Sequence, residues 1–155
     1  MSNKNRKFSV WEHYLAKEIG IEFKACLYFF SILFFYSVYR LTGGSYEAEI
    51  LHMAEMILFT YAMGYIQVYL LGNFDEGEYL RSKEILYLVL CSLCYMVMSL
   101  LCGWFDGKLG VSIGFAFYMM LLYVCAFLVY KSKREIDEKI LNNDLKAFQE
   151  RKKDE

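Results

Sequence analysis

Apolar residues dominate four stretches of the chain, and each stretch is close to the length needed to cross a bilayer. The stretches are Ala25–Tyr39, Met53–Leu71, Ile85–Trp104 and Val111–Tyr130, and short polar loops separate them. A bilayer core requires about 17–25 mostly apolar helical residues, a length that the first stretch reaches by extending back toward Ile21. The pattern therefore predicts an all-α polytopic membrane protein with four transmembrane helices.

The predicted spans occupy most of the chain and leave no room for a separate soluble catalytic domain. The 155 residues are 57% hydrophobic and form one predicted membrane domain, residues 1–155. We expect a cytoplasmic amphipathic segment (1–20), a transmembrane bundle (21–130) and a cytoplasmic helical tail (131–155). The sequence contains no proline, so nothing forces the broken helices that transporters often use at a substrate site.

The placement of lysine and arginine predicts the orientation of the bundle. Both terminal segments are rich in these bases, and the middle loop carries Arg81 and Lys83. The other two loops contain only Arg40 and Lys108. Because cytoplasmic loops carry an excess of Lys and Arg, we expect both termini and the middle loop on the cytoplasmic side of the membrane.

The N-terminal segment is patterned as a helix. Ser9 and Glu12 fit a capping box, in which each side chain satisfies a backbone donor of the other residue. The helix that follows would carry one apolar stripe, made of Phe8, Trp11, Leu15 and Ile19. The stripe suits either a helix lying in the cytoplasmic membrane interface or a plain extension of the first transmembrane helix, with Gly20 as the place for a bend.

The C-terminal tail is also patterned as a helix and carries a short apolar seam. The seam consists of Leu141, Leu145 and Phe148, whose spacing of four and three matches the contact positions of paired helices. We expect this helix either to bind a partner or to pack back on the N-terminal helix of its own chain. Acidic residues of the middle loop are further candidates for partner binding, namely Asp75, Glu76 and Glu78.

Turn residues mark both predicted outer loops. The segment Gly43–Ser45 permits a tight turn and supplies Ser45 as a candidate N-cap of the second helix, and the other loop is expected to turn at Asp106–Gly107. Directly after that turn, Gly110 and Gly114 form a G-x-x-x-G pattern. Small residues at this spacing let helix backbones approach closely, so we predict a helix-packing role for both glycines.

Glu55 is the only acidic residue inside an apolar stretch. Glu49 and His52 precede it at intervals of three, so the three side chains line one face of the predicted helix. Because carboxylates within membranes are often functional, we predict an outer cluster that senses cations, protons or a cationic peptide. One alternative is an interfacial polar cluster with Glu55 paired to Arg40. Another is a metal site of the Glu-x-x-His type, which would need the motif twice.

The cysteines do not predict thiol chemistry. They are Cys26, Cys91, Cys94, Cys102 and Cys125, and all lie in apolar stretches, where cysteine is usually a small hydrophobe. Cys91 and Cys94 have a redox spacing but not the helix N-terminus that stabilises a thiolate. The chain also lacks a phosphate-binding loop and an H-E-x-x-H motif. We therefore predict no enzyme activity, no cofactor, no metal and no direct nucleic-acid binding.

Four short segments carry a resemblance to a known family. They are Gly20-Ile21, Gly72-Asn73-Phe74-Asp75, Gly103-Trp104-Phe105 and Ile140-Leu141-Asn142-Asn143-Asp144-Leu145. Over nearly its whole length the chain resembles the small four-helix bacterial membrane proteins of unknown function called the DUF-3021 family. Members are commonly encoded beside LytTR-type DNA-binding regulators, and some LytTR-associated membrane proteins inhibit their regulator. Helix three of the family tends to open with a His, whereas this chain has Tyr87 nearby.

The resemblance implies a multi-pass protein of the bacterial cell membrane that binds and controls a LytTR-type transcription regulator. A second hypothesis is an accessory or immunity subunit of a membrane transporter complex. Such a subunit would pack laterally through Gly110, Gly114 and its aromatic helix faces. A homo-oligomer is a further hypothesis. Both hypotheses place the lipid bilayer and another protein among the partners.

Overall fold

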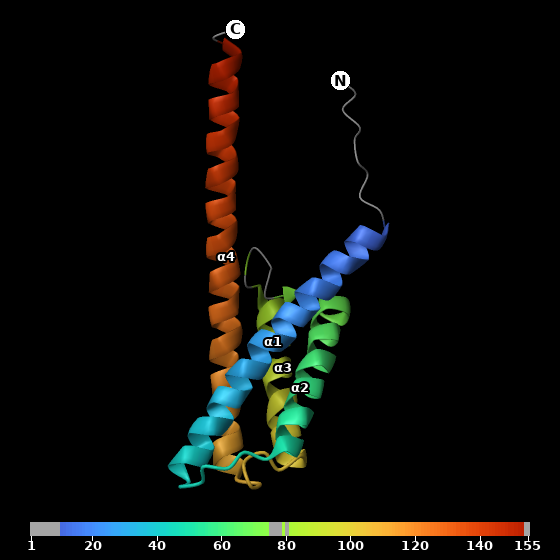
Figure 1. The fold of residues 1–155 in the computed structure, drawn as a ribbon, viewed down its shortest axis with the longest axis vertical. Coiled ribbons are helices and arrows are strands. Elements are labelled where there is room, and N and C mark those ends of the chain that lie inside the picture. Colours follow the sequence, from blue (N-terminus) through green and yellow to red (C-terminus); the bar gives the residue numbers. More distant parts are fainter. Residues whose placement is uncertain (1–9, 75–78, 80, 154–155) are drawn as a thin grey trace.

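The computed structural model describes residues 10–74, 79 and 81–153, and these residues are helical apart from their connections (Figure 1). The elements are α1 (Val10–Thr42), α2 (Ile50–Tyr65), the π-helix η1 (Ile66–Leu70), α3 (Ser82–Leu101) and α4 (Leu109–Lys153). The described part of the chain contains no β-strand. The predicted all-α class is therefore confirmed.

Among the residues that the structure describes, three helices are long and apolar enough to cross a membrane, which indicates association with a bilayer. The three stretches are Lys17–Thr42, Ser82–Leu101 and Leu109–Gln149. The predicted second span differs, because α2 has only 16 residues and a bilayer requires about 17–25. The π-helix η1 follows α2 directly and continues the helical path to Leu70.

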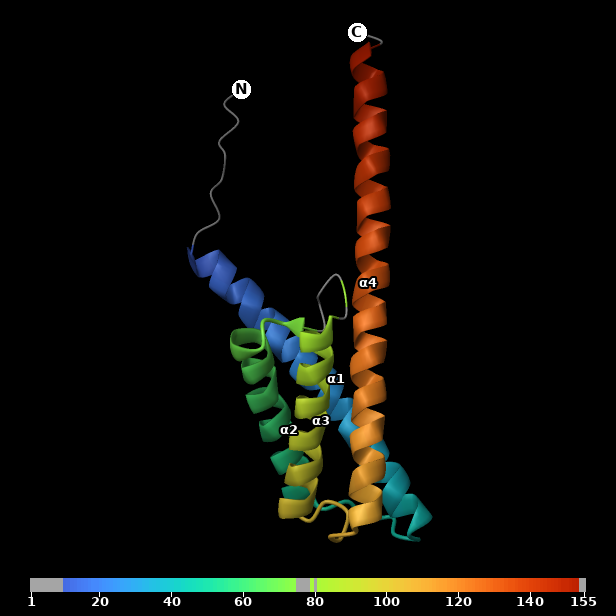
Figure 2. The same ribbon diagram turned by 180° about the vertical axis from the view of Figure 1, so that it is seen from behind.

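The helices form a bundle that α1 crosses obliquely, as opposite views show (Figures 1 and 2). The α1–α2 and α3–α4 connections lie together at one end of the bundle, which we call the distal end. The opposite end, which we call the terminal end, contains the start of α3 and the point where α4 leaves the bundle. Toward the terminal end α1 diverges from α4, because α1 runs diagonally over the other helices while α4 stands upright.

Both long helices continue without a break into the segments predicted as separate terminal helices. α1 is helical through Gly20, so a separate interfacial helix is absent from the described residues, and the segment extends the first predicted span instead. Ser9 of the predicted capping box lies outside the described residues. α4 runs far beyond the other helices at the terminal end (Figure 2), and its final turns do not pack back on α1.

The two distal connections differ in how far they follow the sequence prediction. Asp106 and Gly107 both have positive φ, 53° and 68°, and Lys108 N–H donates to the Phe105 carbonyl at 3.0 Å. This is the expected turn, of the mirror-image type that Asp-Gly pairs favour. Ser45 does not cap α2, because α2 begins at Ile50 after an extended segment that includes Glu49.

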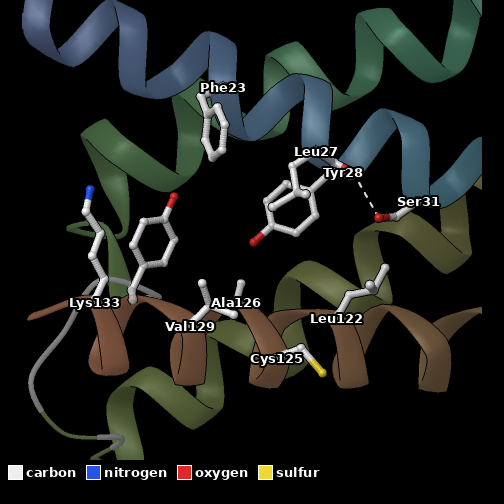
Figure 3. A pocket seen from close by; sticks show the side chains of 10 residues that line it. Phe23, Leu27, Tyr28, Ser31, Leu122, Cys125, Ala126, Val129 and Lys133 are labelled. Atoms are coloured by element: carbon white, nitrogen blue, oxygen red, sulfur yellow. Dashed lines mark hydrogen bonds between the residues drawn. The ribbon is translucent and has the colours of Figure 1, made fainter. Parts of the chain in front are cut away.

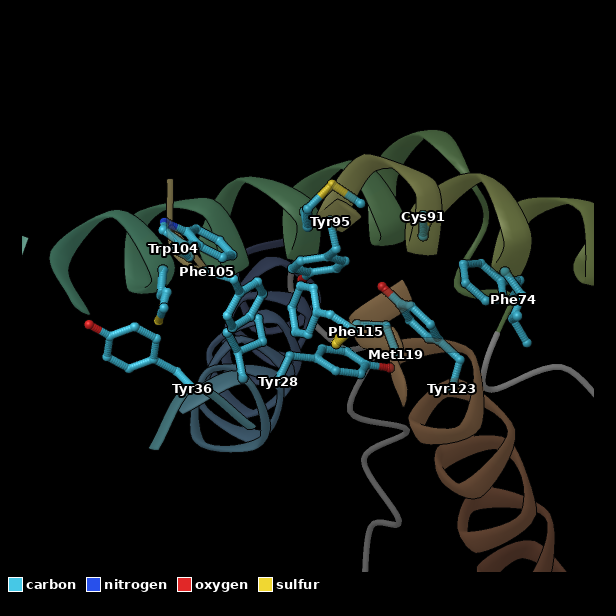
Figure 4. Close-up of a cluster of buried hydrophobic side chains, with 14 residues drawn as sticks. Tyr28, Tyr36, Phe74, Cys91, Tyr95, Trp104, Phe105, Phe115, Met119 and Tyr123 are labelled. Atoms are coloured by element: carbon cyan, nitrogen blue, oxygen red, sulfur yellow. The ribbon is translucent and has the colours of Figure 1, made fainter. Parts of the chain in front are cut away.

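An aromatic core joins the helices along the length of the bundle (Figure 4). Tyr28 of α1 packs on Tyr123 of α4 with ring centroids 4.9 Å apart, and Phe35 of α1 contacts Phe115 of α4 at 5.3 Å. Rings of this size bridge helices whose backbones are well separated. Where α1 and α2 approach more closely the contact is through Gly64, since a Cβ added there would lie 3.3 Å from the Ile21 side chain.

Candidate functional site

The sequence after α3 places an indole ring at the distal end of the bundle. Gly103 adopts a φ of 70°. The backbone N–H of Trp104 donates to the Ser99 carbonyl at 3.0 Å. A left-handed glycine with this bond is the Schellman arrangement that ends a helix and reverses the chain. The reversal turns Trp104 back into the bundle, where its side chain is buried.

The three residues of the predicted outer cluster lie in contact at this end. His52 Nδ1 is 3.1 Å from Glu55 Oε2, and His52 Nε2 is 3.2 Å from Glu49 Oε2. The Trp104 indole N–H donates to Glu55 Oε2 at 3.1 Å. We call the first three residues the Glu49–His52–Glu55 cluster. Trp104 is the indole donor to this cluster. Each ring nitrogen of His52 therefore has a carboxylate oxygen within hydrogen-bond distance.

The cluster is closed on its bundle side and open on the other. The side chain of His52 is 14% exposed, whereas that of Glu49 is 55% exposed. On the closed side, the Tyr36 ring of α1 meets the His52 ring edge-on with centroids 6.3 Å apart, and the Tyr36 hydroxyl accepts from the Glu49 N–H at 3.4 Å. The cluster is therefore held against α1 and faces outward through Glu49.

Arg40 does not pair with Glu55. Its guanidinium lies 3.9 Å from Asp106, and its Nε–H donates to the Glu47 carbonyl at 3.1 Å. Asp106 in turn accepts from the Tyr39 hydroxyl at 2.7 Å. These bonds join the two distal connections to the end of α1, so the arginine stabilises the loops and is not a partner of the Glu55 charge.

Cys102 is a neighbour of the cluster that the sequence did not assign to it. It is the C-cap of α3 and is half-buried. Burial raises the pKa of the Cys102 thiol, and the charge of the nearby Glu55 carboxylate raises that pKa further. The thiol therefore stays protonated near neutral pH, which makes it a donor to Glu55 and a poor nucleophile.

The geometry does not assemble a metal site in the described residues. No group of three or more His, Cys, Asp and Glu side chains there is arranged to hold an ion. The Glu-x-x-His spacing of Glu49 and His52 instead produces a hydrogen-bonded pair. What the cluster can do chemically is exchange a proton on His52 or attract a cation to the exposed Glu49.

Lys24 of α1 is a buried charge that the sequence pattern did not lead us to expect. Only 1% of Lys24 is exposed, and its ammonium donates to the side-chain oxygen of Asn73. Asn73 follows η1 with a φ of 58°, so the bond ties α1 to the start of the α2–α3 connection. The signal was present in the sequence, because Lys24 shares a helical face with Tyr28 and Ile32, which are also buried.

The seam predicted in the tail is exposed and continues the bundle-facing side of α4. The exposed fraction is 63% for Leu141, 48% for Leu145 and 67% for Phe148. Leu141 and Leu145 follow the buried residues Tyr123 and Phe127 by about five full helical turns each. The same face of one continuous helix is therefore covered inside the bundle and bare beyond it.

The other predicted partner-binding residues are only partly placed. Asp75, Glu76 and Glu78 lie outside the described residues. Tyr79 of the same connection lines a polar hollow of about 320 Å³ together with residues of α4, namely Lys131, Arg134, Glu135 and Glu138. The α2–α3 connection and the first tail residues therefore share one surface at the terminal end.

Gly110 and Gly114 make no close helix contact within the described chain. A Cβ added at either position would meet no atom within 4 Å, and both residues are exposed on α4. The described residues therefore provide no packing partner for the G-x-x-x-G pattern, and its packing role stays a prediction. The chain has no match among protein-family models, curated proteins or solved structures.

Proposed function

We propose that the chain is a small integral membrane protein that binds and controls a cytoplasmic protein partner, such as a LytTR-type transcription regulator. The observation that carries the proposal is the bare seam Leu141–Leu145–Phe148 on an extension of α4. An apolar face on a projecting helix is stabilised by a second helix or by a groove in a partner protein.

The proposal includes four membrane spans with both termini in the cytoplasm. α2 and η1 together run from Ile50 to Leu70, which falls within the ~17–25 residues that a bilayer requires. Large apolar side chains are exposed along this stretch, among them Leu51, Leu58 and Leu70, and lipid would cover them. The Lys and Arg excess at the terminal end supports a cytoplasmic position for that end.

In this proposal the Glu49–His52–Glu55 cluster receives the signal on the outer side. Histidine is the side chain whose charge ordinarily changes between pH 5 and 8. A proton or cation at His52 and Glu49 acts on the bonds to Glu55 and Trp104, which connect α2 to the end of α3. The signal controls the partner if it binds one helix arrangement better than another, because otherwise it shifts no population.

The seam is tested by replacing Leu141, Leu145 and Phe148 with Ala in the full chain. Alanine preserves the helix and removes the apolar side chains, so we expect loss of a co-expressed LytTR-type regulator from an affinity purification in mild detergent. The matched control replaces Ile136 and Ile140, which are equally exposed on an adjoining face, and should retain the regulator. Undiminished capture by the seam variant would refute the proposal.

The second candidate is an accessory or immunity subunit of a transporter complex, and the open space at Gly110 and Gly114 favours it. Small residues on a lipid-facing helix allow a neighbouring span to approach closely. Substituting both glycines by Leu should then release a co-purifying transporter subunit, while the seam variant keeps it. The regulator proposal predicts the opposite response for the two variants.

A further inference from the structure

A groove opens between α1 and α4 in the terminal half of the bundle (Figure 3). It exists because α1 crosses the bundle obliquely and diverges from α4 toward the terminal end (Figures 1 and 2). The groove has a volume of about 360 Å³, which falls in the range of roughly 300–1,000 Å³ typical of small-molecule sites.

The walls of the groove are almost entirely hydrocarbon. α1 contributes Phe23 and Leu27, and α4 contributes Ala126 and Val129. The Ser31 hydroxyl, which also lines the groove, donates to the Leu27 carbonyl at 2.9 Å, so its proton is not available to an occupant. In a bilayer such a groove is open to the lipid chains, and its natural occupant is hydrocarbon rather than a polar ligand.

One end of the groove is basic. Lys133 lines it where α4 leaves the bundle, and Figure 3 shows its amine across the groove from Phe23. Lys24 Nζ lies 5.6 Å from the centre of the ring of Tyr130, another lining residue, but Lys24 is buried and donates to Asn73, so Lys133 is the base that the groove presents. Basic residues at the cytoplasmic mouth of a cleft between membrane helices are suited to anionic lipid headgroups.

We propose that this groove binds one acyl chain of an anionic phospholipid, with the headgroup phosphate paired to Lys133. The proposal rests on the transmembrane placement of the proposed function but not on the protein partner. A zwitterionic lipid brings its own positive group to the basic mouth, whereas an anionic lipid leaves its charge to Lys133. The site therefore selects lipid by headgroup charge and holds it by its chain.

The headgroup contact is tested with the full chain in mild detergent by native mass spectrometry. Phosphatidylglycerol and phosphatidylcholine with identical acyl chains are added in separate titrations. One base near the lipid surface corresponds to about a fivefold difference in affinity, so we expect a preference of that size for phosphatidylglycerol at one site. Lys133→Ala should remove the preference, and Lys131→Ala, a neighbouring base that does not line the groove, should keep it.

The chain contact is tested by Ala126→Phe, which fills the groove from α4. This variant should lose the bound lipid of either headgroup, whereas Val124→Phe, on a residue outside the groove lining, should retain it. Three results would each overturn the proposal. The first is equal binding of the two lipids, and the second is lipid retained by Ala126→Phe. The third is a dimer mass that Ala126→Phe abolishes. Loss of regulator capture in the seam variant leaves these measurements unchanged, so the two proposals fail separately.

Discussion

Glu55 shows how a carboxylate is kept at the edge of a hydrophobic bundle. A charged group placed there is costly unless donors surround it, and two donors from different elements meet one oxygen: His52 from its own helix and Trp104 from the turn after α3. The spacing of Glu49, His52 and Glu55 predicted the first donor. The second was hidden from the sequence, because it depends on a chain reversal that brings a residue from a distant position.

The thiol of Cys102 provides a pH-dependent probe of that carboxylate. Glu55→Gln removes the negative charge that raises the Cys102 pKa, so the pKa should fall while burial still holds it above its usual value. The expected result is faster alkylation of Cys102 at pH 8.5, with the rate profile shifted to lower pH. The measurement uses the purified chain with the other cysteines replaced by serine.

Glu49→Gln is the control for this experiment, because Glu49 contacts His52 and is not among the groups that raise the Cys102 pKa. Its alkylation profile should match that of the parent chain. A Glu55→Gln profile that coincides with the parent profile would show that Glu55 does not act on the thiol.

The buried pair of Lys24 and Asn73 should be strongly coupled in stability. Asn73→Gly keeps the positive φ but removes one acceptor of the Lys24 ammonium. A hydrogen bond to a charged group contributes about 1.5–3 kcal/mol, so the free energy of unfolding in an SDS titration should fall by about that amount. Adding Lys24→Met should restore part of the loss, because the buried charge is then gone, and strictly additive effects would contradict the coupling.

At the scale of elements, a glycine that ends a helix and a glycine inside a helix have different effects on stability. Gly103 has a φ of 70° and directs Trp104 into the bundle, while Gly114 lies in the interior of α4 without a close neighbour. We therefore expect substitution by Ala to change the stability of the protein in opposite directions at the two positions.

Gly103→Ala should destabilise the bundle by about 1–2 kcal/mol, because an L-residue is strained in the left-handed region. It should also weaken the Trp104 contact to Glu55, which tryptophan fluorescence can follow. Gly114→Ala should instead stabilise α4 by about 0.5–1 kcal/mol in the same unfolding measurement. If both variants lost stability equally, the cap at Gly103 would have no special role.

The sequence predicted elements where the physical cause is local and missed them where it is not. Apolar stretches and the Asp106–Gly107 turn were foreseen, since both follow from neighbouring residues. The start of α2 was not, because Ser45 offered a good cap while the chain continues extended to Glu49. The burial of Lys24 was missed although Lys24 shares a helical face with the buried residues Tyr28 and Ile32. A charge at the edge of an apolar stretch resembles a flanking base until the tertiary contact with Asn73 is known.

At the scale of the whole molecule, the number of spans determines on which sides the termini lie. Three helices meet the length and composition of a span, and the path from Ile50 to Leu70 is the candidate fourth. An even number of spans puts both termini on one side, and an odd number puts them on opposite sides. The side of the tail therefore tests the status of α2 and η1.

Single cysteines introduced into a cysteine-free chain can measure that side. We expect a membrane-impermeant maleimide to label Ser45→Cys in intact cells and to label Asn143→Cys only after the cells are opened. Ser45 belongs to a distal connection and Asn143 to the exposed tail. Labelling of Asn143→Cys in intact cells would indicate three spans and would place the seam outside the cytoplasm.

The unbroken course of α4 from Leu109 to Lys153 makes it a lever. At 1.5 Å per residue the helix is about 68 Å long, and the bundle grips only its first part (Figure 2). When a rigid helix tilts about the part that is packed in the bundle, the displacement of each residue grows in proportion to its distance from that part. A tilt of α4 within the bundle would therefore displace the tip that carries Phe148 farther than any residue at the distal end, and no hinge along the helix would be required to transmit it.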